Sequence, residues 1–254
     1  MFTATNARIA SIDSSTVETE IALLNSQWNS SSKLTDQLDK IIAMVDFSAS
    51  MYQGPIEAAF ALGCRVAEKS KLGKRVLSFS SSPTWHNLDN CSTFVEMIET
   101  LQSGTIGYST NFYKALSVIL DSIIEYKIPP EEVENMILAI FSDMQINEAG
   151  EGLNMNTMYE NITKLYKDAG IKIWGKPFRP PHILFWNLRN TAGFPCLSNE
   201  SNVSMMSGFS PALLNSFCKL GMDALKDFTP WSMLVSQLNN PRYDSLKFTV
   251  SSIK

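Results

Sequence analysis

Cysteine and histidine, the residues of zinc sites and disulfide frameworks, are scarce in this sequence. Four cysteines and two histidines occur in 254 residues, and no two cysteines have the CxxC spacing. A zinc site or a disulfide framework is therefore disfavoured, and we predict free or buried thiols in a reducing compartment. The two histidines, His86 and His182, are expected to be structural.

Long apolar runs and an excess of positive charge are also missing. No segment approaches the ~18 apolar residues that a membrane helix needs, and the first residues lack the basic start and apolar run of a secretory signal. The formal net charge of −4 leaves no basic excess to neutralise phosphates, which disfavours nucleic-acid binding. We therefore expect a soluble intracellular protein, in the cytoplasm or nucleus, with no membrane partner.

The sequence does contain a regular alternation of strands and helices. Apolar runs of strand length alternate with segments whose apolar residues recur at helical spacing. The strands are apolar throughout, as in a parallel sheet covered on both faces, so we predict a doubly wound, Rossmann-like α/β fold. The predicted strands are 40–47, 74–81, 84–88, 134–144, 181–189 and 202–210. The predicted helices are 55–71, 92–102, 110–127, 157–170 (closed by Gly170) and 210–221.

This alternation also divides the chain. Residues 1–36 are polar and form a lead-in with room for one helix around 20–28. Residues 37–222 form the α/β domain, and residues 223–254 are predicted to be a helical C-terminal tail. The two tryptophans near the end of the alternation, Trp174 and Trp186, are expected in the core.

Three loops are expected to meet at one edge of the sheet, because ligands of open parallel sheets bind at the carboxyl ends of the strands. They are "DFSAS" (46–50), "GYSTNF" (107–112) and "FSDM" (141–144). Their oxygen-bearing side chains suit Mg²⁺ or Mn²⁺ better than zinc. The predicted metal ligands are Asp46, Ser48, Ser50, Thr110 and Asp143, and the predicted rim is Met51, Tyr52, Tyr108, Asn111 and Gln145.

Each of these loops also has an ordinary structural interpretation. Asp and Ser are common in turns, Ser109 or Thr110 before a helix is typical of an N-cap, and Asp143 after a strand is typical of a turn. The metal-site interpretation depends on all three loops occurring in order, each at the same edge of the fold.

The segments "MVDFSASM", "STNFYKAL" and "FSDM" resemble the three motifs of the metal-ion-dependent adhesion site (MIDAS) of von Willebrand factor A domains. More narrowly, "ILFWNLR" and "MMSGFSPALL" resemble an uncharacterised family of plants and giant DNA viruses. The A-like domain of that family is related to the one in the Ro autoantigen and other TROVE proteins. Ala49 departs from the glycine that many A domains have between the two serines.

The resemblance implies a von Willebrand factor A fold and a function. Ser48, Ser50 and Thr110 would contact the ion directly, and Asp46 and Asp143 directly or through water. The vacant coordination position would capture a Glu or Asp carboxylate of a protein partner, so we expect a cation-dependent binding module and not an enzyme. Two alternatives remain open: a ribonucleoprotein component, with RNA possible but not favoured, or a Mg²⁺-dependent phosphohydrolase with Asp46 as nucleophile. If the chain is viral, a virion is a further location.

Overall fold

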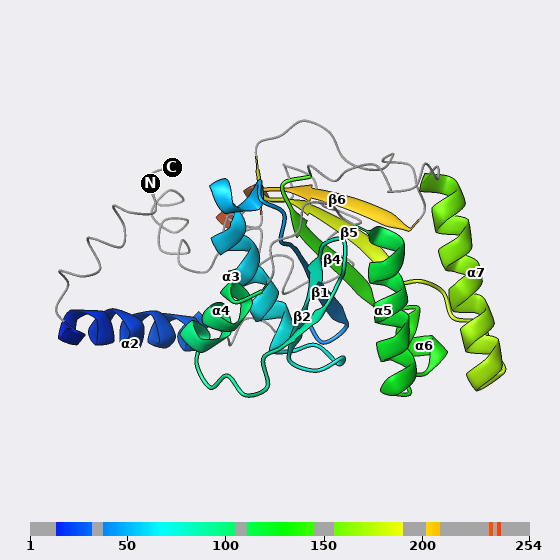
Figure 1. Cartoon of the computed structure of the whole chain (residues 1–254), viewed down its shortest axis with the longest axis horizontal. Helices are drawn as coiled ribbons and strands as arrows, with labels where there is room; N and C mark the ends of the chain where they lie inside the picture. Colours follow the sequence, from blue (N-terminus) through cyan, green and yellow to red (C-terminus); the bar gives the residue numbers. More distant parts are fainter. Residues whose placement is uncertain are drawn as a thin grey trace, which may run out of the picture.

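The computed structural model describes residues 14–31, 38–104, 111–144, 155–189 and 202–208, and two short pieces at 234–235 and 238–239. These residues form a six-stranded sheet flanked by helices (Figure 1). The strands are β1 (Ile41–Asp46), β2 (Arg75–Phe79), β3 (Trp85–Asn87), β4 (Ile137–Ser142), β5 (His182–Asn187) and β6 (Val203–Ser207). The helices are α2 (Ser14–Ser31), η2 (Met51–Gln53), α3 (Ile56–Ala67), α4 (Phe94–Gln102), α5 (Phe112–Glu125), α6 (Pro130–Val133) and α7 (Met155–Trp174).

The strand order shows how the chain winds. Across the sheet the order is β3-β2-β1-β4-β5-β6. All neighbouring pairs are parallel except β2 and β3, which are antiparallel. The chain therefore starts at β1, moves outward through β2 and β3, and returns to the other side of β1 as β4. This confirms the predicted doubly wound, mostly parallel α/β fold and places its topological switch point between β1 and β4.

Apolar layers cover both faces of the sheet. Helices α3 and α4 pack on one face, and α5 and α7 on the other (Figure 1). Successive side chains of β1 alternate between the layers, with Ala43 and Val45 facing α3 and Ile42 and Met44 facing α5. Because both faces are covered, every residue of β1 and β4 is buried. This burial explains why these strands are apolar nearly throughout.

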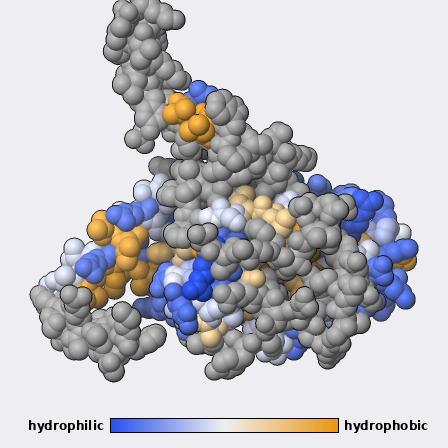
Figure 2. Space-filling view, turned by 90° about the horizontal axis from the view of Figure 1, so that it is seen from above, coloured by the Kyte–Doolittle hydropathy of each residue, from blue (hydrophilic) through white to orange (hydrophobic). Residues whose placement is uncertain are grey.

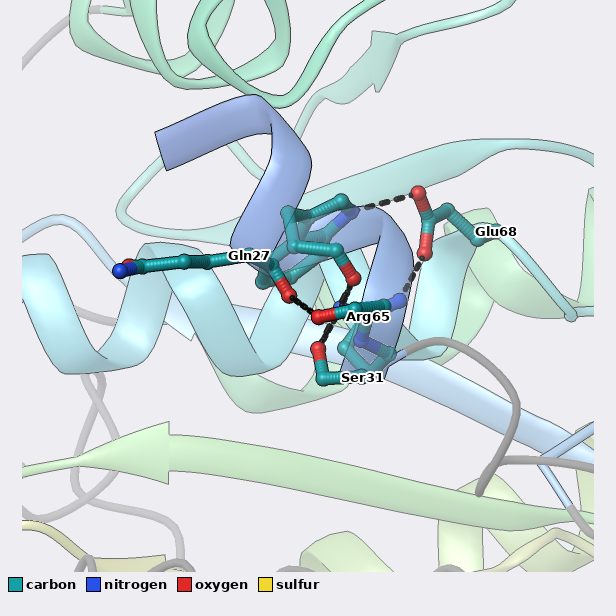
Figure 3. A network of polar contacts seen from close by, with 6 residues as sticks. Gln27, Ser31, Arg65 and Glu68 are labelled. Carbon is teal, nitrogen blue, oxygen red and sulfur yellow. Dashed lines mark hydrogen bonds and ion pairs between the residues drawn. The ribbon is translucent and has the colours of Figure 1, made fainter. Parts of the chain in front are cut away.

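Helix α2 is anchored to the α3 side of the domain by Trp28 and by polar contacts that join Ser31 to Arg65 and Arg65 to Glu68 (Figure 3). The Trp28 ring stacks on Phe94 with the ring centroids 4.0 Å apart, and its Nε1 donates a hydrogen bond to Glu68 at 2.8 Å. Arg65 of α3 lies 3.5 Å from the centroid of the Trp28 ring. Its guanidinium donates to the Trp28 carbonyl and to Ser31 Oγ, both at 2.8 Å, and to Glu68 at 2.9 Å. The predicted lead-in thus contains a helix that the domain holds through a buried arginine.

Loss of this arginine is expected to release α2. We predict that Arg65→Ala lowers the free energy of unfolding by about 2–3 kcal/mol, because several hydrogen bonds to a charged group disappear. Denaturant unfolding and limited proteolysis near residues 14–31 measure the two effects. Arg179→Ala is the matched control, since the Arg179–Glu134 ion pair is exposed and is expected to contribute less than about 1 kcal/mol. Equal effects of the two substitutions would contradict the anchoring role of Arg65.

Part of α2 exposes apolar side chains. Ile21, Leu23 and Leu24 are 36%, 57% and 48% exposed, and the helix forms an apolar group on the surface (Figure 2). Within the described ranges, no helix combines the length and the apolar character needed to span a membrane.

Helix α7 differs from the prediction at its C-terminal end. Gly170 does not close the helix, which continues to Trp174; Gly175 has the positive φ of 67° that a glycine adopts after a helix. Trp174 is 43% exposed, so its expected place in the core was wrong, whereas Trp186 is fully buried as predicted. The predicted helix at 210–221 lies outside the described residues, as does nearly all of the predicted tail.

Candidate functional site

Two carboxylates lie at the switch point of the sheet. Asp46 is the last residue of β1, and Asp143 follows the last residue of β4; both are fully buried. Open α/β sheets bind ligands at the carboxyl ends of two neighbouring parallel strands whose following connections lead toward opposite edges of the sheet. The structure therefore brings together two predicted ligands that are far apart in the sequence.

Two hydrogen bonds orient the Asp46 carboxylate. The backbone N–H of Ser48 donates to Oδ1 at 2.8 Å, and the Ser142 hydroxyl donates to Oδ2 at 2.7 Å. Burial raises the pKa of Asp46 above its ordinary value. The nearby Asp143 adds to the rise, while the hydrogen bonds from Ser142 and Ser48 oppose it. Asp46 is thus held in place by hydrogen bonds, while burial still penalises its ionised form.

The hydroxyls of Ser48 and Ser50 share a hydrogen bond, with their Oγ atoms 3.0 Å apart. Ser50 immediately precedes η2 but makes no side-chain capping bond to it, so the capping interpretation does not account for this residue. Ala49 causes no strain in the loop. Among the described non-glycine residues, only Lys127 and Met144 have a positive φ.

The spacing of these hydroxyls fits two adjacent ligands of one ion. At the Mg–O distance of about 2.0–2.1 Å, neighbouring oxygens of an octahedron are about 2.9 Å apart, close to the 3.0 Å between Ser48 Oγ and Ser50 Oγ. In the part of the chain that the structure describes, no three or more Asp, Glu, His or Cys side chains form a group that could hold a metal. The candidate centre consists instead of two carboxylates and two hydroxyls, a set that suits Mg²⁺ or Mn²⁺.

Sequence reasoning missed two residues of this site, Ser142 and Arg189. Ser142 links the two strand ends, because it donates to Asp46 and its Oγ accepts the N–H of Met144 at 3.0 Å. The sequence could have indicated Ser142, because alternate residues of a strand lie on one face. Ser142 follows Leu138 and Ile140 on the face of the sheet that Asp46 also shares. Arg189, after β5, places Nη1 3.4 Å from Asp143 Oδ2. Only the strand order, which puts β5 beside β4, predicts that contact.

The predicted rim is changed by the structure. Met51 is fully buried in the core, so its assignment to the rim was wrong. The Asn111 side chain caps α5 by accepting the N–H of Lys114 at 2.9 Å, and Tyr52 is half-buried. Three predicted residues, Thr110, Tyr108 and Gln145, lie outside the described residues. The backbone N–H of Asn111 donates to the Ser80 carbonyl just after β2, so the residue next to Thr110 lies at this edge of the sheet.

The histidines and the described cysteines make structural contacts. His86 stacks on Phe47 with the ring centroids 5.1 Å apart, and His182 shares a hydrogen bond of 2.8 Å with Ser204 across β5 and β6. Burial raises the pKa of Cys64 to about 12, which leaves its thiol unreactive. Cys64 and Cys91 are both free.

Comparison with known proteins gives relatives of this chain. It is 32% identical over 223 residues to an uncharacterised protein of Acanthamoeba polyphaga mimivirus; the match covers 85% of this chain and 36% of the viral protein. The chain thus spans about a third of that relative's length.

Three solved structures are also similar. They are the Ro (RSR) protein of Deinococcus radiodurans (13% identity, TM-score 0.49, 73% of this chain and 35% of that one), the VWA domain of SpRpn10 (12%, 0.39, 75% and 94%), and the manganese-loaded TRAP protein of Plasmodium vivax (12%, 0.42, 71% and 72%). The model of one family, described as a domain of unknown function (DUF7788), matches residues 40–247. The match spans the whole described sheet and both strand ends that carry the carboxylates, and the chain belongs to this DUF7788 family.

Proposed function

We propose that this domain is a divalent-cation-dependent protein-binding module. Mg²⁺ or Mn²⁺ would be held by Ser48 and Ser50 with the carboxylates of Asp46 and Asp143, and Thr110 would complete the set. The observation that carries the proposal is the 3.0 Å spacing of the two serine hydroxyls beside two fully buried carboxylates. A bound cation would offset the cost of burying the ionised Asp46 carboxylate.

An acidic partner follows from the same arrangement. Mg²⁺ prefers about six oxygen ligands, and the proposed set leaves a position for an oxygen from outside the chain. A carboxylate is the favoured ligand for this position, because an anionic oxygen binds a hard cation more strongly than a neutral oxygen does. We therefore propose capture of a Glu or Asp side chain of a protein partner.

A binding role is favoured over catalysis. In the described residues, neither Ser48 Oγ nor Ser50 Oγ is hydrogen-bonded to a histidine, lysine or cysteine that would act as a general base. The position two residues after Asp46 is Ser48, where a phosphohydrolase with an Asp nucleophile would need a second carboxylate. Turnover of a phosphate ester that disappears in Asp46→Asn would overturn this view.

Cation binding is the first prediction of the proposal. Calorimetric titration of the chelator-stripped protein with Mg²⁺ and with Mn²⁺ is expected to show saturable binding. Ser48→Ala and Asp143→Ala are each expected to weaken it by more than the roughly 10–100-fold that loss of an outer-shell group costs. Ser117→Ala and Asp121→Ala, on α5 and away from the strand ends, are the matched controls. Saturable binding that survives both site variants would place the ion elsewhere.

Partner capture has a separate test. The probe is a pool of short peptides, each with one Glu or Asp in a neutral sequence, and a matched pool with Gln or Asn. Retention of the acidic pool alone, in Mn²⁺ but not in chelator, is expected. Retention that is insensitive to chelator would contradict the role of the cation in partner binding.

A further inference from the structure

Arg189 brings a positive charge to the candidate metal site but is loosely held there. Within the part of the chain that the structure describes, Arg189 meets the site through the 3.4 Å approach of Nη1 to Asp143 Oδ2, and its side chain is 35% exposed while that of Asp143 is fully buried. A firm charge-assisted hydrogen bond measures roughly 2.7–2.9 Å. The buried Arg65, by contrast, makes three contacts of 2.8–2.9 Å. The Arg189 guanidinium can therefore leave Asp143 far more easily than Arg65 can leave α2.

The backbone below Arg189 is fixed. Its N–H donates to Asn187 Oδ1 at 2.9 Å, and the N–H of Leu188 donates to the Ser142 carbonyl at 2.9 Å. The Asn187 carbonyl in turn accepts the N–H of Gly208 at 2.8 Å. These bonds hold the end of β5 against β4 and β6, so only the Arg189 side chain needs to move when the guanidinium departs.

A guanidinium on Asp143 opposes a second cation at the same carboxylate. Like charges repel, and the repulsion is screened least where the carboxylate is buried. We propose that Arg189 is an intramolecular competitor for the cation site. Its guanidinium neutralises Asp143 when no divalent ion is bound and turns to solvent when one binds. This inference rests on the proposed function, because it concerns occupancy of the same site.

The experiment compares Mn²⁺ binding by calorimetry in the wild-type chain and in Arg189→Gln, Arg189→Lys and Arg179→Gln. Removal of the competing charge is expected to tighten Mn²⁺ binding roughly tenfold, within the usual range of coupling between two sites. Arg189→Lys keeps the charge and is expected to bind like the wild type. Arg179→Gln removes an exposed arginine paired with Glu134 and is expected to change nothing. The thermal shift that Mn²⁺ produces gives a second reading of the same affinities.

Each outcome separates this inference from the proposed function. Tighter binding in Arg189→Gln alone supports the competitor role, most strongly if the wild-type chain binds too weakly to measure. Equal affinities in the wild type and Arg189→Gln, with binding lost in Ser48→Ala, overturn the competitor role and leave the metal site intact. Weaker binding in Arg189→Gln also overturns it and makes Arg189 a support for Asp143. Absence of Mn²⁺ binding in every variant overturns both proposals.

Discussion

Replacement of Asp46 by asparagine is expected to raise the stability of the metal-free protein and to abolish its response to divalent cations. In chelator, we predict that Asp46→Asn increases the free energy of unfolding by about 0.5–2 kcal/mol, the range of a typical stabilising substitution. For a domain of this size the melting temperature would rise by roughly 2–4 °C per kcal/mol. Asparagine keeps the shape of the side chain and an oxygen that can accept the N–H of Ser48.

The sign of this effect follows from the pKa of Asp46. Burial raises that pKa above its ordinary value, so the folded protein binds a proton at Asp46 more readily than the unfolded chain does. Above the raised pKa, the ionised carboxylate therefore costs stability. As the pH falls through the raised pKa the carboxyl group becomes neutral and this cost disappears. The advantage of Asp46→Asn is expected at neutral pH and should shrink with acidification.

Divalent cations are expected to reverse the order of stability. A ligand that binds only the folded state stabilises it by about 2.7 kcal/mol at a concentration one hundred times its dissociation constant. The wild-type chain should gain this stability in Mn²⁺, and Asp46→Asn should gain none. Thermal melts of both proteins in chelator and in Mn²⁺, over a range of pH, test whether the order of stability reverses. Asp121→Asn, an exposed carboxylate on α5, is the control and should behave like the wild type.

Two results would contradict this account. Lower stability of Asp46→Asn in chelator would mean that the hydrogen bonds from Ser48 and Ser142 outweigh the cost of burial. An undiminished Mn²⁺ shift in Asp46→Asn would mean that any bound ion does not need this carboxylate.

The strands were predictable because the sheet is covered on both faces. Every residue of Ile41–Asp46 and Ile137–Ser142 is buried, so apolar side chains are required at nearly every position and a charged residue there is conspicuous. The same property made Asp46 and Asp143 visible as site residues, since Asp46 directly follows an apolar run and Asp143 follows another with only Ser142 between them. The parallel order then brings the two carboxyl ends together.

Other features depend on tertiary contacts that a local pattern does not contain. Met51 flanks the serine loop in the sequence, yet η2 turns its side chain into the core. Trp174 is as apolar as Trp186, but it ends a helix at the surface, whereas Trp186 lies inside the sheet. Arg189 meets Asp143 only because β5 is the neighbour of β4. Side chains at the margins of elements are therefore the ones that sequence patterns placed wrongly or missed.

The role of Gly170 also depends on a tertiary contact that the local sequence pattern does not contain. Its replacement by alanine has the largest effect on stability that we predict. Replacement of a glycine inside a helix by alanine usually raises the free energy of unfolding by about 1 kcal/mol. Here the added Cβ would clash with the backbone nitrogen of Phe178 and would lie 2.6 Å from the Lys176 carbonyl oxygen. Backbone atoms cannot rotate away as a side chain can, so Gly170→Ala is expected to lower the free energy of unfolding by about 3 kcal/mol.

Gly175→Ala provides the comparison for Gly170→Ala, because it lies at the end of the same helix and meets no atom within 4 Å. Its cost should be about 1–2 kcal/mol, from the positive φ alone. Equal losses in denaturant unfolding would show that backbone conformation and not close packing makes Gly170 necessary. Segment 176–178 precedes the start of β5 at His182, whereas the candidate metal site lies at the other end of that strand, where Asn187 pairs with Ser142. Gly170→Ala should therefore reduce the amount of folded protein while leaving the Mn²⁺ affinity of each folded molecule unchanged.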